Sequence, residues 1–134
     1  MPSNEKQKYF DATADRETRD DLKNAVKLVE TPKVAIDCGC GAGSDIAFLI
    51  SEGFIVHGFD IEKESIERCQ KRFEDDDHVH LSQDSFISFE YPSASLIVAD
   101  ASLFFSHEDE FGKVWRKIND SLIPNGIFCG SFLG

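Results

Sequence analysis

The chain has 134 residues, the size of a single domain, and its 25 acidic and 14 basic side chains give it a formal charge of -11. So negative a surface repels phosphate backbones, which argues against nucleic acid as a partner. Hydrophobic residues make up 41% of the chain, enough for a packed core, and no apolar run reaches the roughly 18 residues of a membrane span.

Short apolar runs alternate with helical patterns along the chain. The first helical pattern ends at Pro32, Ser44 is placed to cap the next helix, and Gly53 is placed to end it. The turn 124–126 precedes the last apolar run. The predicted helices cover about 11–30, 44–52, 62–74 and 111–122, and the predicted strands about 33–38, 54–60, 78–83, 95–100 and 127–132.

This alternation predicts an α/β fold: a doubly wound, mostly parallel, Rossmann-like sheet with helices on both faces. No linker, repeat or low-complexity stretch interrupts it. We therefore expect one domain over residues 1–134, with an N-terminal helix at about 11–30 and a core at 33–134.

Four of the apolar runs stop on an aspartate: Asp37, Asp60, Asp84 and Asp100. Buried parallel strands end at a common edge of the sheet, where open α/β folds bind their ligands. The first of these aspartates is followed at once by the glycine string 39–43. A row of carboxylates beside a backbone-lined turn suits a cationic ligand rich in hydrogen-bond donors, a description that S-adenosylmethionine meets.

Two other interpretations of these residues fit the sequence less well. A dinucleotide-binding turn needs a third glycine where this chain has Ser44, and Asp37 would repel a pyrophosphate. Asp60 suits a ribose diol in either case. Aspartates at strand ends also cap turns, although four in register beside a glycine turn make that explanation weaker.

The four cysteines are Cys38, Cys40, Cys69 and Cys129, and we interpret them as small, semi-apolar packing residues. The single residue between Cys38 and Cys40 is fewer than the roughly two to four of zinc knuckles, and no second ligand pair is placed to join them. Residues 1–30 are polar and charged and do not resemble a signal peptide. We expect no metal site, and reduced thiols in the cytoplasm.

The sequence resembles the class I S-adenosylmethionine-dependent methyltransferases, over roughly residues 7–134. The small soluble tellurite-resistance and thiopurine types are the most similar. The resemblance rests on motifs that occur in the family's order: VAIDCGCGAG (34–43), GFDIEKESIERC (58–69), SQDSF (82–86), LIVADASLFF (96–105) and LIPNGIF (122–128).

The resemblance implies roles for residues at the first strand and the turn after it. Gly39 and Gly41 would pass under the methionine part of the cofactor, while Asp37 would fix its amino group. Arg16 would pair with the cofactor carboxylate, and Tyr9 is a possible lid residue.

The later motifs imply contacts with the nucleoside. Asp60 would take both ribose hydroxyls and Ile61 would pack on the adenine face. Asp84 would accept the adenine amine, and the Ser85 amide would meet a ring nitrogen.

The resemblance also implies an acceptor site at the fourth strand, where Asp100 and Ala101 would lie beside the sulfonium. The acceptor is expected to be a small molecule, and no catalytic base is assigned. The candidate acceptor contacts are Ser102, Phe104, Phe105 and His107.

A complete fold of this family has seven strands, and the predicted pattern contains five. We therefore expect the domain to be C-terminally incomplete, with residues 127–133 as a bare sheet edge that is prone to self-association. The alternatives to a methyltransferase are a non-catalytic S-adenosylmethionine-binding module and, less favoured, a nicotinamide-dependent oxidoreductase domain.

Overall fold

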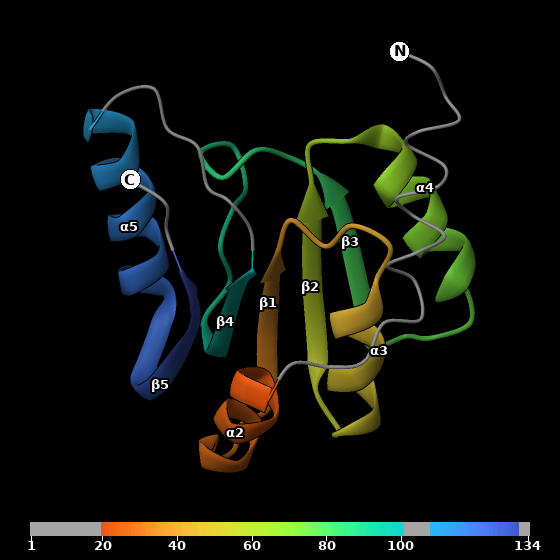
Figure 1. Cartoon of the computed structure of the whole chain (residues 1–134), viewed down its shortest axis with the longest axis horizontal. Helices are drawn as coiled ribbons and strands as arrows, with labels where there is room; N and C mark the ends of the chain where they lie inside the picture. The colour runs from red at the N-terminus through yellow and green to blue at the C-terminus, as the bar shows by residue number, and fades with distance from the viewer. Residues whose placement is uncertain (1–19, 101–107, 132–134) are drawn as a thin grey trace.

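The computed structural model describes residues 20–100 and 108–131, in which helices and strands alternate as the sequence predicts (Figure 1). Most predicted boundaries agree with it to within two residues. The helices are α2 (Asp20–Leu28), α3 (Ser44–Ser51), α4 (Lys63–Arg72) and α5 (Glu108–Ser121). The strands are β1 (Val34–Cys38), β2 (Ile55–Asp60), β3 (Val79–Gln83), β4 (Ala94–Asp100) and β5 (Leu122–Ser131).

The five strands form one sheet in the order β3-β2-β1-β4-β5, and every pairing between them is parallel. The chain builds outward from β1 to β3 on one side and then crosses to β4 and β5 on the other. The predicted doubly wound α/β fold is therefore confirmed. Its reversal of strand order lies between β1 and β4, and ligands bind at such a reversal, outside the carboxyl ends of the strands.

Side chains alternate between the two faces of the sheet, and each face is buried under different elements. Helices α2, α3 and α4 contribute Leu22, Leu49 and Ile66 to one core cluster. Helix α5 and the segment after β3 contribute Val114, Ile118 and Phe89 to the other. Both faces of a parallel sheet are thus covered, as its continuous apolar strands require.

A glycine with positive φ lies at each end of helix α3. The sequence predicted Ser44 as its N-cap, but the N-cap is Gly43 in the left-handed region (φ 91°), and Ser44 is the first helical residue. At the other end, Gly53 has φ 87°, its N–H donates to Ile50 O at 3.0 Å, and the Phe54 N–H donates to Leu49 O at 3.1 Å. This pair of bonds is a Schellman motif, so Gly53 ends the helix as predicted.

The last strand departs from prediction. It was expected at 127–132 behind a turn, whereas β5 begins at Leu122, which pairs with Ala94. The next pair is Leu96 with Ile127, so residues 123–126 bulge opposite a single residue of β4, and Asn125 adopts φ 68°. The expected turn is therefore a bulge within a longer strand.

The N-terminal helix predicted at 11–30 is described only from Asp20, and it ends at Leu28. Its predicted start lies outside the described residues. Within the ranges described, no helix has the length and apolar character that crossing a membrane demands.

Candidate functional site

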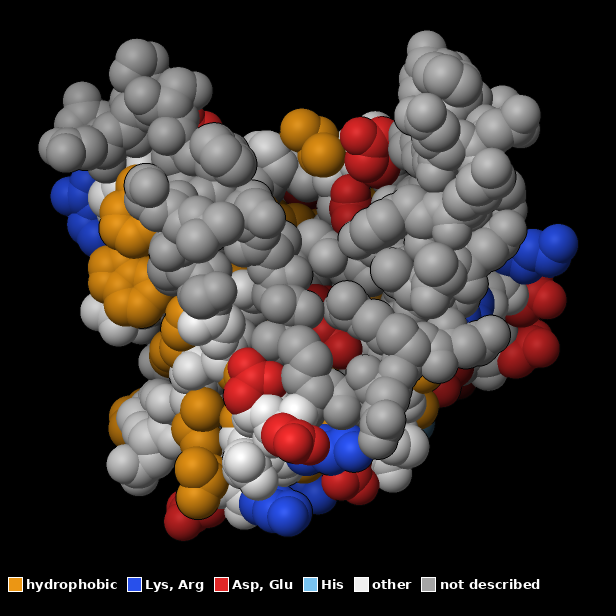
Figure 2. Space-filling model, viewed as in Figure 1, with side chains coloured by type: hydrophobic (Ala, Val, Ile, Leu, Met, Phe, Trp, Pro, Cys, Tyr) orange, Lys and Arg blue, Asp and Glu red, His pale blue; other side chains and the backbone are white. Residues whose placement is uncertain are grey.

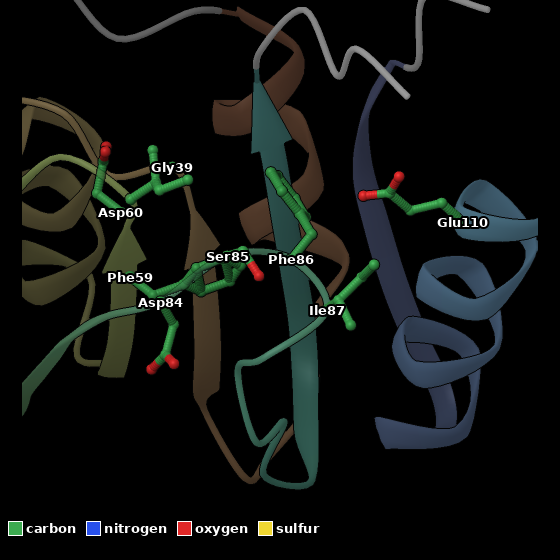
Figure 3. Close-up of a pocket in the computed structure, with 9 residues that line it drawn as sticks. Gly39, Phe59, Asp60, Asp84, Ser85, Phe86, Ile87 and Glu110 are labelled. Atoms are coloured by element: carbon green, nitrogen blue, oxygen red, sulfur yellow. The ribbon is translucent and has the colours of Figure 1, made fainter. Parts of the chain in front are cut away.

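A cavity of about 220 Å³ opens at the carboxyl edge of the sheet, at the predicted position. Its walls come from the turn after β1, the end of β2, the segment after β3 and the first turn of α5 (Figure 3). The lining residues are Gly39, Phe59, Asp60, Ile61, Asp84, Ser85, Phe86, Ile87 and Glu110.

The glycine turn leaves open space beside its backbone. Gly39 and Gly41 adopt φ values of 74° and 53°, a region that favours glycine, and a Cβ at either position would meet no atom within 4 Å. The N–H groups of Gly39 and Cys40 both donate to Phe59 O, at 2.8 and 3.0 Å. The turn is thus fastened to β2 while its outer side stays free for a ligand.

Asp60 joins this turn to the end of β2. Its Oδ2 accepts from the Gly41 N–H at 2.9 Å, and its Oδ1 accepts from the Glu62 N–H at 2.9 Å. A carboxylate oxygen can accept a second hydrogen bond, so both oxygens keep capacity for a ligand hydroxyl. The half-buried Asp60 carboxylate is therefore positioned by two backbone groups before any ligand arrives.

The segment after β3 is held by its own serines. Ser88 Oγ accepts from the Ser85 N–H at 2.9 Å, Ser85 Oγ accepts from the Ser88 N–H at 3.0 Å, and the Ser88 hydroxyl donates to Asp84 Oδ1 at 2.8 Å. The Asp84 carboxylate points away from those of Asp60 and Glu110 (Figure 3). The Ser85 N–H already donates to Ser88 Oγ. To contact an adenine nitrogen as predicted, this N–H would have to share that hydrogen bond or give it up.

The predicted row of four aspartates lies at one edge of the sheet, but the four are not equivalent. Asp37 pairs with Gly58 and Val98, two positions before Asp60 and Asp100. It therefore lies inside the sheet, is 3% exposed, and is absent from the cavity wall. Its carboxylate lies near two thiols, since it contributes to raising the pKa of both Cys38 and Cys40.

The structure thus gathers Gly39, Asp60, Ile61, Asp84 and Ser85 around the cavity, with Gly41 one hydrogen bond away. Asp100 is the last residue of β4 and pairs with the backbone of Ser131. The other predicted contacts lie outside the described residues: Tyr9, Arg16, Ala101, Ser102, Phe104, Phe105 and His107.

Four lining residues were not predicted as site residues: Phe59, Phe86, Ile87 and Glu110. Phe59 is 1% exposed, and the ring of Phe86 meets its edge with centroids 5.2 Å apart. The signal for Phe86 and Ile87 was their apolar character directly after the polar pair Asp84-Ser85. Glu110 carried no such signal, because its place depends on where α5 begins relative to the sheet.

These residues fit S-adenosylmethionine. The open backbone at Gly39 and Gly41 admits a chain passing close to the turn, and the Asp60 carboxylate suits a ribose diol. Ile61 is 68% exposed beside the cavity, so an apolar surface is available to a flat aromatic base.

Comparison with known proteins agrees with this geometry. The family model described as "Methyltransferase domain" matches residues 35–126, which is more than half of the chain. No curated protein sequence matches the chain.

Solved structures share the fold. DesVI of Streptomyces venezuelae superposes with a TM-score of 0.77 at 18% identity, covering 99% of this chain and 58% of that one. A candidate S-adenosylmethionine-dependent methyltransferase of Methanococcus maripaludis gives 0.70 at 23% identity, covering 83% and 53%. The cyclopropane synthase MmaA2 of Mycobacterium tuberculosis gives 0.68 at 19% identity, covering 80% and 39%.

This chain therefore spans about half the length of the Methanococcus protein. It spans less than two thirds of the length of each of these three proteins. The family match, the strand order and the acidic, glycine-lined cavity agree with one another. The chain belongs to the S-adenosylmethionine-dependent methyltransferase domain family.

Proposed function

We propose that this domain binds S-adenosylmethionine in the cavity at the carboxyl edge and transfers its methyl group to a small-molecule acceptor. The observation that carries the proposal is the bond from the Gly41 N–H to Asp60 Oδ2. It fixes a ribose-binding carboxylate and a glycine turn relative to each other, so that two parts of one cofactor are recognised at a set separation.

The cofactor occupies the end of the cavity nearest β1 and β2. Asp60 accepts the two ribose hydroxyls through charge-assisted hydrogen bonds, and Ile61 covers one face of the adenine. Asp84 accepts the adenine amine after a rotation of its side chain toward the cavity. Asp37, buried in β1, acts as a fixed negative charge beneath the turn and favours the cofactor's cationic groups.

The acceptor occupies the end of the cavity nearest α5. Phe86 and Ile87 supply apolar contacts there, and the Glu110 carboxylate is directed toward Phe86 (Figure 3). An acceptor with an apolar body and an amino or hydroxyl group suits such a wall. Glu110 holds that group and accepts its proton where the nucleophile has to lose one.

When bound, the cofactor supplies an electrophilic methyl group on a positively charged sulfur. The protein aligns the acceptor's nucleophile with that group and excludes water from the reacting atoms. The packed aromatic wall of Phe59, Phe86 and Phe89 supports this alignment, since Phe59 stacks on Phe89 with centroids 4.3 Å apart and meets Phe86 edge-on.

Two properties support a small molecule in a reducing compartment. The charge of -11 disfavours a nucleic acid acceptor, and a cavity of about 220 Å³ leaves little room for a large one. All four cysteines are free thiols, which supports the cytoplasm. The tellurite-resistance or thiopurine subtype stays a prediction.

A transfer assay tests the proposal. Labelled S-adenosylmethionine is incubated with the protein and panels of small amines, thiols and phenols, with tRNA and a mixed protein substrate in parallel. We expect label on a small molecule. Label on tRNA or protein alone would refute the small-molecule acceptor, and cofactor binding with no transfer to any panel would favour the non-catalytic module.

We also propose that the chain self-associates through β5. In the part of the chain that is described, β5 has a neighbouring strand, β4, on one side only (Figure 1). A strand edge with open hydrogen-bonding groups pairs readily with another chain. Light scattering with hydrogen exchange tests this: a dimer with slow exchange over 127–131 is expected, and a monomer with fast exchange there would contradict it.

A further inference from the structure

Two free thiols meet behind the glycine turn. Cys40 lies in the turn between Gly39 and Gly41, Cys69 lies in α4, and their Sγ atoms are 3.9 Å apart. Cys69 is fully buried, while Cys40 is 7% exposed, beside the open space that flanks both glycines. Gly39, the residue before Cys40, lines the cavity, so the turn that carries Cys40 borders the space that a small solute can enter.

The same helix supports the turn through further contacts. The Cys69 thiol donates to Gly41 O at 3.3 Å, and Arg72 Nη1 donates to Ala42 O at 3.0 Å. A Cβ added at Gly43 would lie 3.2 Å from Cys69 Sγ, so turn and helix are in close contact. A change at Cys69 therefore acts directly on the backbone of the turn.

The surroundings of the two thiols give them different roles. The hydrogen bond between the two thiols lowers the pKa of Cys69, and the Arg72 guanidinium adds to this effect, against the opposing influence of burial and of Asp60. The same hydrogen bond and burial raise the pKa of Cys40. Cys69 is thus the thiol that loses its proton more readily, and Cys40 is the thiol that keeps it. A nucleophilic thiol and its resolving partner are arranged in this way.

We propose that Cys40 and Cys69 form a dithiol that hydrogen peroxide oxidises reversibly to a disulfide, and that this disulfide weakens cofactor binding. The effect on binding rests on the proposed function, whereas the oxidation itself does not. No role for either sulfur follows from methyl transfer.

The oxidation balances with one peroxide for two thiols. The Cys69 thiolate attacks one peroxide oxygen, forming an S–O bond as the O–O bond breaks, and the departing hydroxide takes up the proton that Cys69 released. The deprotonated Cys40 sulfur then attacks the Cys69 sulfur and expels the sulfenic oxygen as hydroxide, which the Cys40 proton converts to a second water. Two electrons pass from the sulfurs to the peroxide.

The disulfide would displace the turn. A disulfide needs an S–S distance of about 2.05 Å, so the gap of 3.9 Å has to shorten by roughly half. Both cysteines belong to the core cluster with Ile66, but Cys69 lies within helix α4 and Cys40 lies in a turn between two glycines, so we expect the movement to fall mainly on the turn. Oxidation also removes the hydrogen that Cys69 donates to Gly41 O, and it draws the Gly41 N–H away from Asp60.

The other two cysteines serve as internal controls. Cys129 lies on β5, two strands from β1 in the sheet order, with its Sγ 3.8 Å from Asp21 Oδ2. Cys38 is fully buried, and burial raises its pKa well above the ordinary value. The short sulfur–sulfur contact joins Cys40 to Cys69 and involves neither of these two thiols, so Cys129→Ser leaves the proposed pair intact.

The test uses the whole chain, reduced and then treated with hydrogen peroxide. Peptide mass mapping reads the cross-link, and calorimetric titration with S-adenosylhomocysteine reads affinity. We expect a Cys40–Cys69 cross-link, an affinity lowered about tenfold or more by loss of one charge-assisted hydrogen bond, and recovery with dithiothreitol. Cys129→Ser should respond as the wild type does, while Cys40→Ser and Cys69→Ser should have equal affinity before and after peroxide.

Each alternative outcome is decisive. Absence of the cross-link in the wild type, or an equal loss of affinity after peroxide in Cys40→Ser, would overturn the dithiol. A cross-linked protein that binds as tightly as the reduced one would overturn the control of binding. If the reduced protein does not bind S-adenosylhomocysteine, the proposed function and the control of binding both fail, while mass mapping still decides the oxidation. Should Cys69→Ser not fold, Cys40→Ala serves as the second single variant.

Discussion

The two ends of the cavity are lined by different kinds of chemical group. At the end nearest β1 and β2, the wall is backbone and one carboxylate: Gly39 and Gly41 in left-handed conformations, with Asp60 bonded to two N–H groups. At the end nearest α5, the wall is side chains, with Phe86 and Ile87 from a segment after β3 and Glu110 from the helix. The shape of the first end depends on the backbone conformation, and the shape of the second depends on the identity of its side chains.

This difference separates the two recognition tasks of a methyltransferase domain. A cofactor that never changes is suited by a site whose geometry depends on glycine conformations and hydrogen bonds within the protein. An acceptor that differs between relatives is suited by side chains that can be exchanged without altering the sheet. We expect substitutions at the two ends to act separately on cofactor affinity and on methyl transfer.

Asp60→Ala should have the largest effect. Loss of two charge-assisted hydrogen bonds to the ribose should lower S-adenosylhomocysteine affinity by about 30-fold or more. Because the Gly41 and Glu62 N–H groups also lose their acceptor, the free energy of unfolding should fall by about 1–3 kcal/mol. Calorimetry and urea unfolding measure both, and a folded variant with unchanged affinity would show that the ribose lies elsewhere.

Gly39→Ala should come next, with Gly53→Ala as its matched control. Both glycines have positive φ, 74° and 87°, so an alanine costs each about 1–2 kcal/mol of stability. The Gly39 methyl would project into the open side of the turn, in the cavity wall, whereas the Gly53 methyl would lie 3.9 Å from Lys33, at the far end of α3. Affinity should fall about tenfold in Gly39→Ala alone. An equal loss in both variants would mean that strain, not space, limits binding.

Ile61→Ala tests the adenine contact. Ile61 is 68% exposed in the protein without ligand, so its truncation should leave stability unchanged. Burial of its side chain under the adenine contributes about 1 kcal/mol, so affinity should fall about fivefold. Leu28→Ala is the control, since Leu28 is 69% exposed on α2 and lies outside the cavity wall. Equal cofactor affinities in the two variants would show that Ile61 does not contact the cofactor.

Glu110→Gln should change cofactor affinity least, by less than about twofold, because Glu110 lies at the acceptor end. Its effect should appear as a fall of about tenfold in kcat/KM for methyl transfer, the size expected for loss of one hydrogen bond to a charged group. Parallel titration and steady-state kinetics decide this. A large loss of cofactor affinity in Glu110→Gln would contradict the division of the cavity into two ends.

The sequence predicted the backbone-built end well and the side-chain-built end poorly. The glycines at every second position of the turn and the aspartate at the end of β2 are local signals in the sequence. The parallel pairing of β1 with β2 then places the turn beside that aspartate. Glu110 carries no local signal, and its proximity to Phe86 depends on how α5 and the segment after β3 pack on the same face of the sheet.

The position of Asp37 relative to the other aspartates and the start of β5 both depend on strand register. The pattern placed Asp37 at a strand end, and only the pairing with Gly58 and Val98 shows that it lies two positions inside the edge. The turn at 124–126 looked like a strand boundary, but Leu122 already pairs with Ala94, and the bulge absorbs the turn residues. Register between distant segments decides both points, and a one-dimensional pattern does not encode register.

The central claim is that the backbone-built end of the cavity is an S-adenosylmethionine site. Parallel calorimetric titrations of the reduced protein with S-adenosylhomocysteine and with NAD test it most directly. We expect saturable binding of S-adenosylhomocysteine that is lost in Asp60→Ala, together with a rise in Tm by mass action, and no heat with NAD. Saturable binding of NAD without binding of S-adenosylhomocysteine would contradict the account.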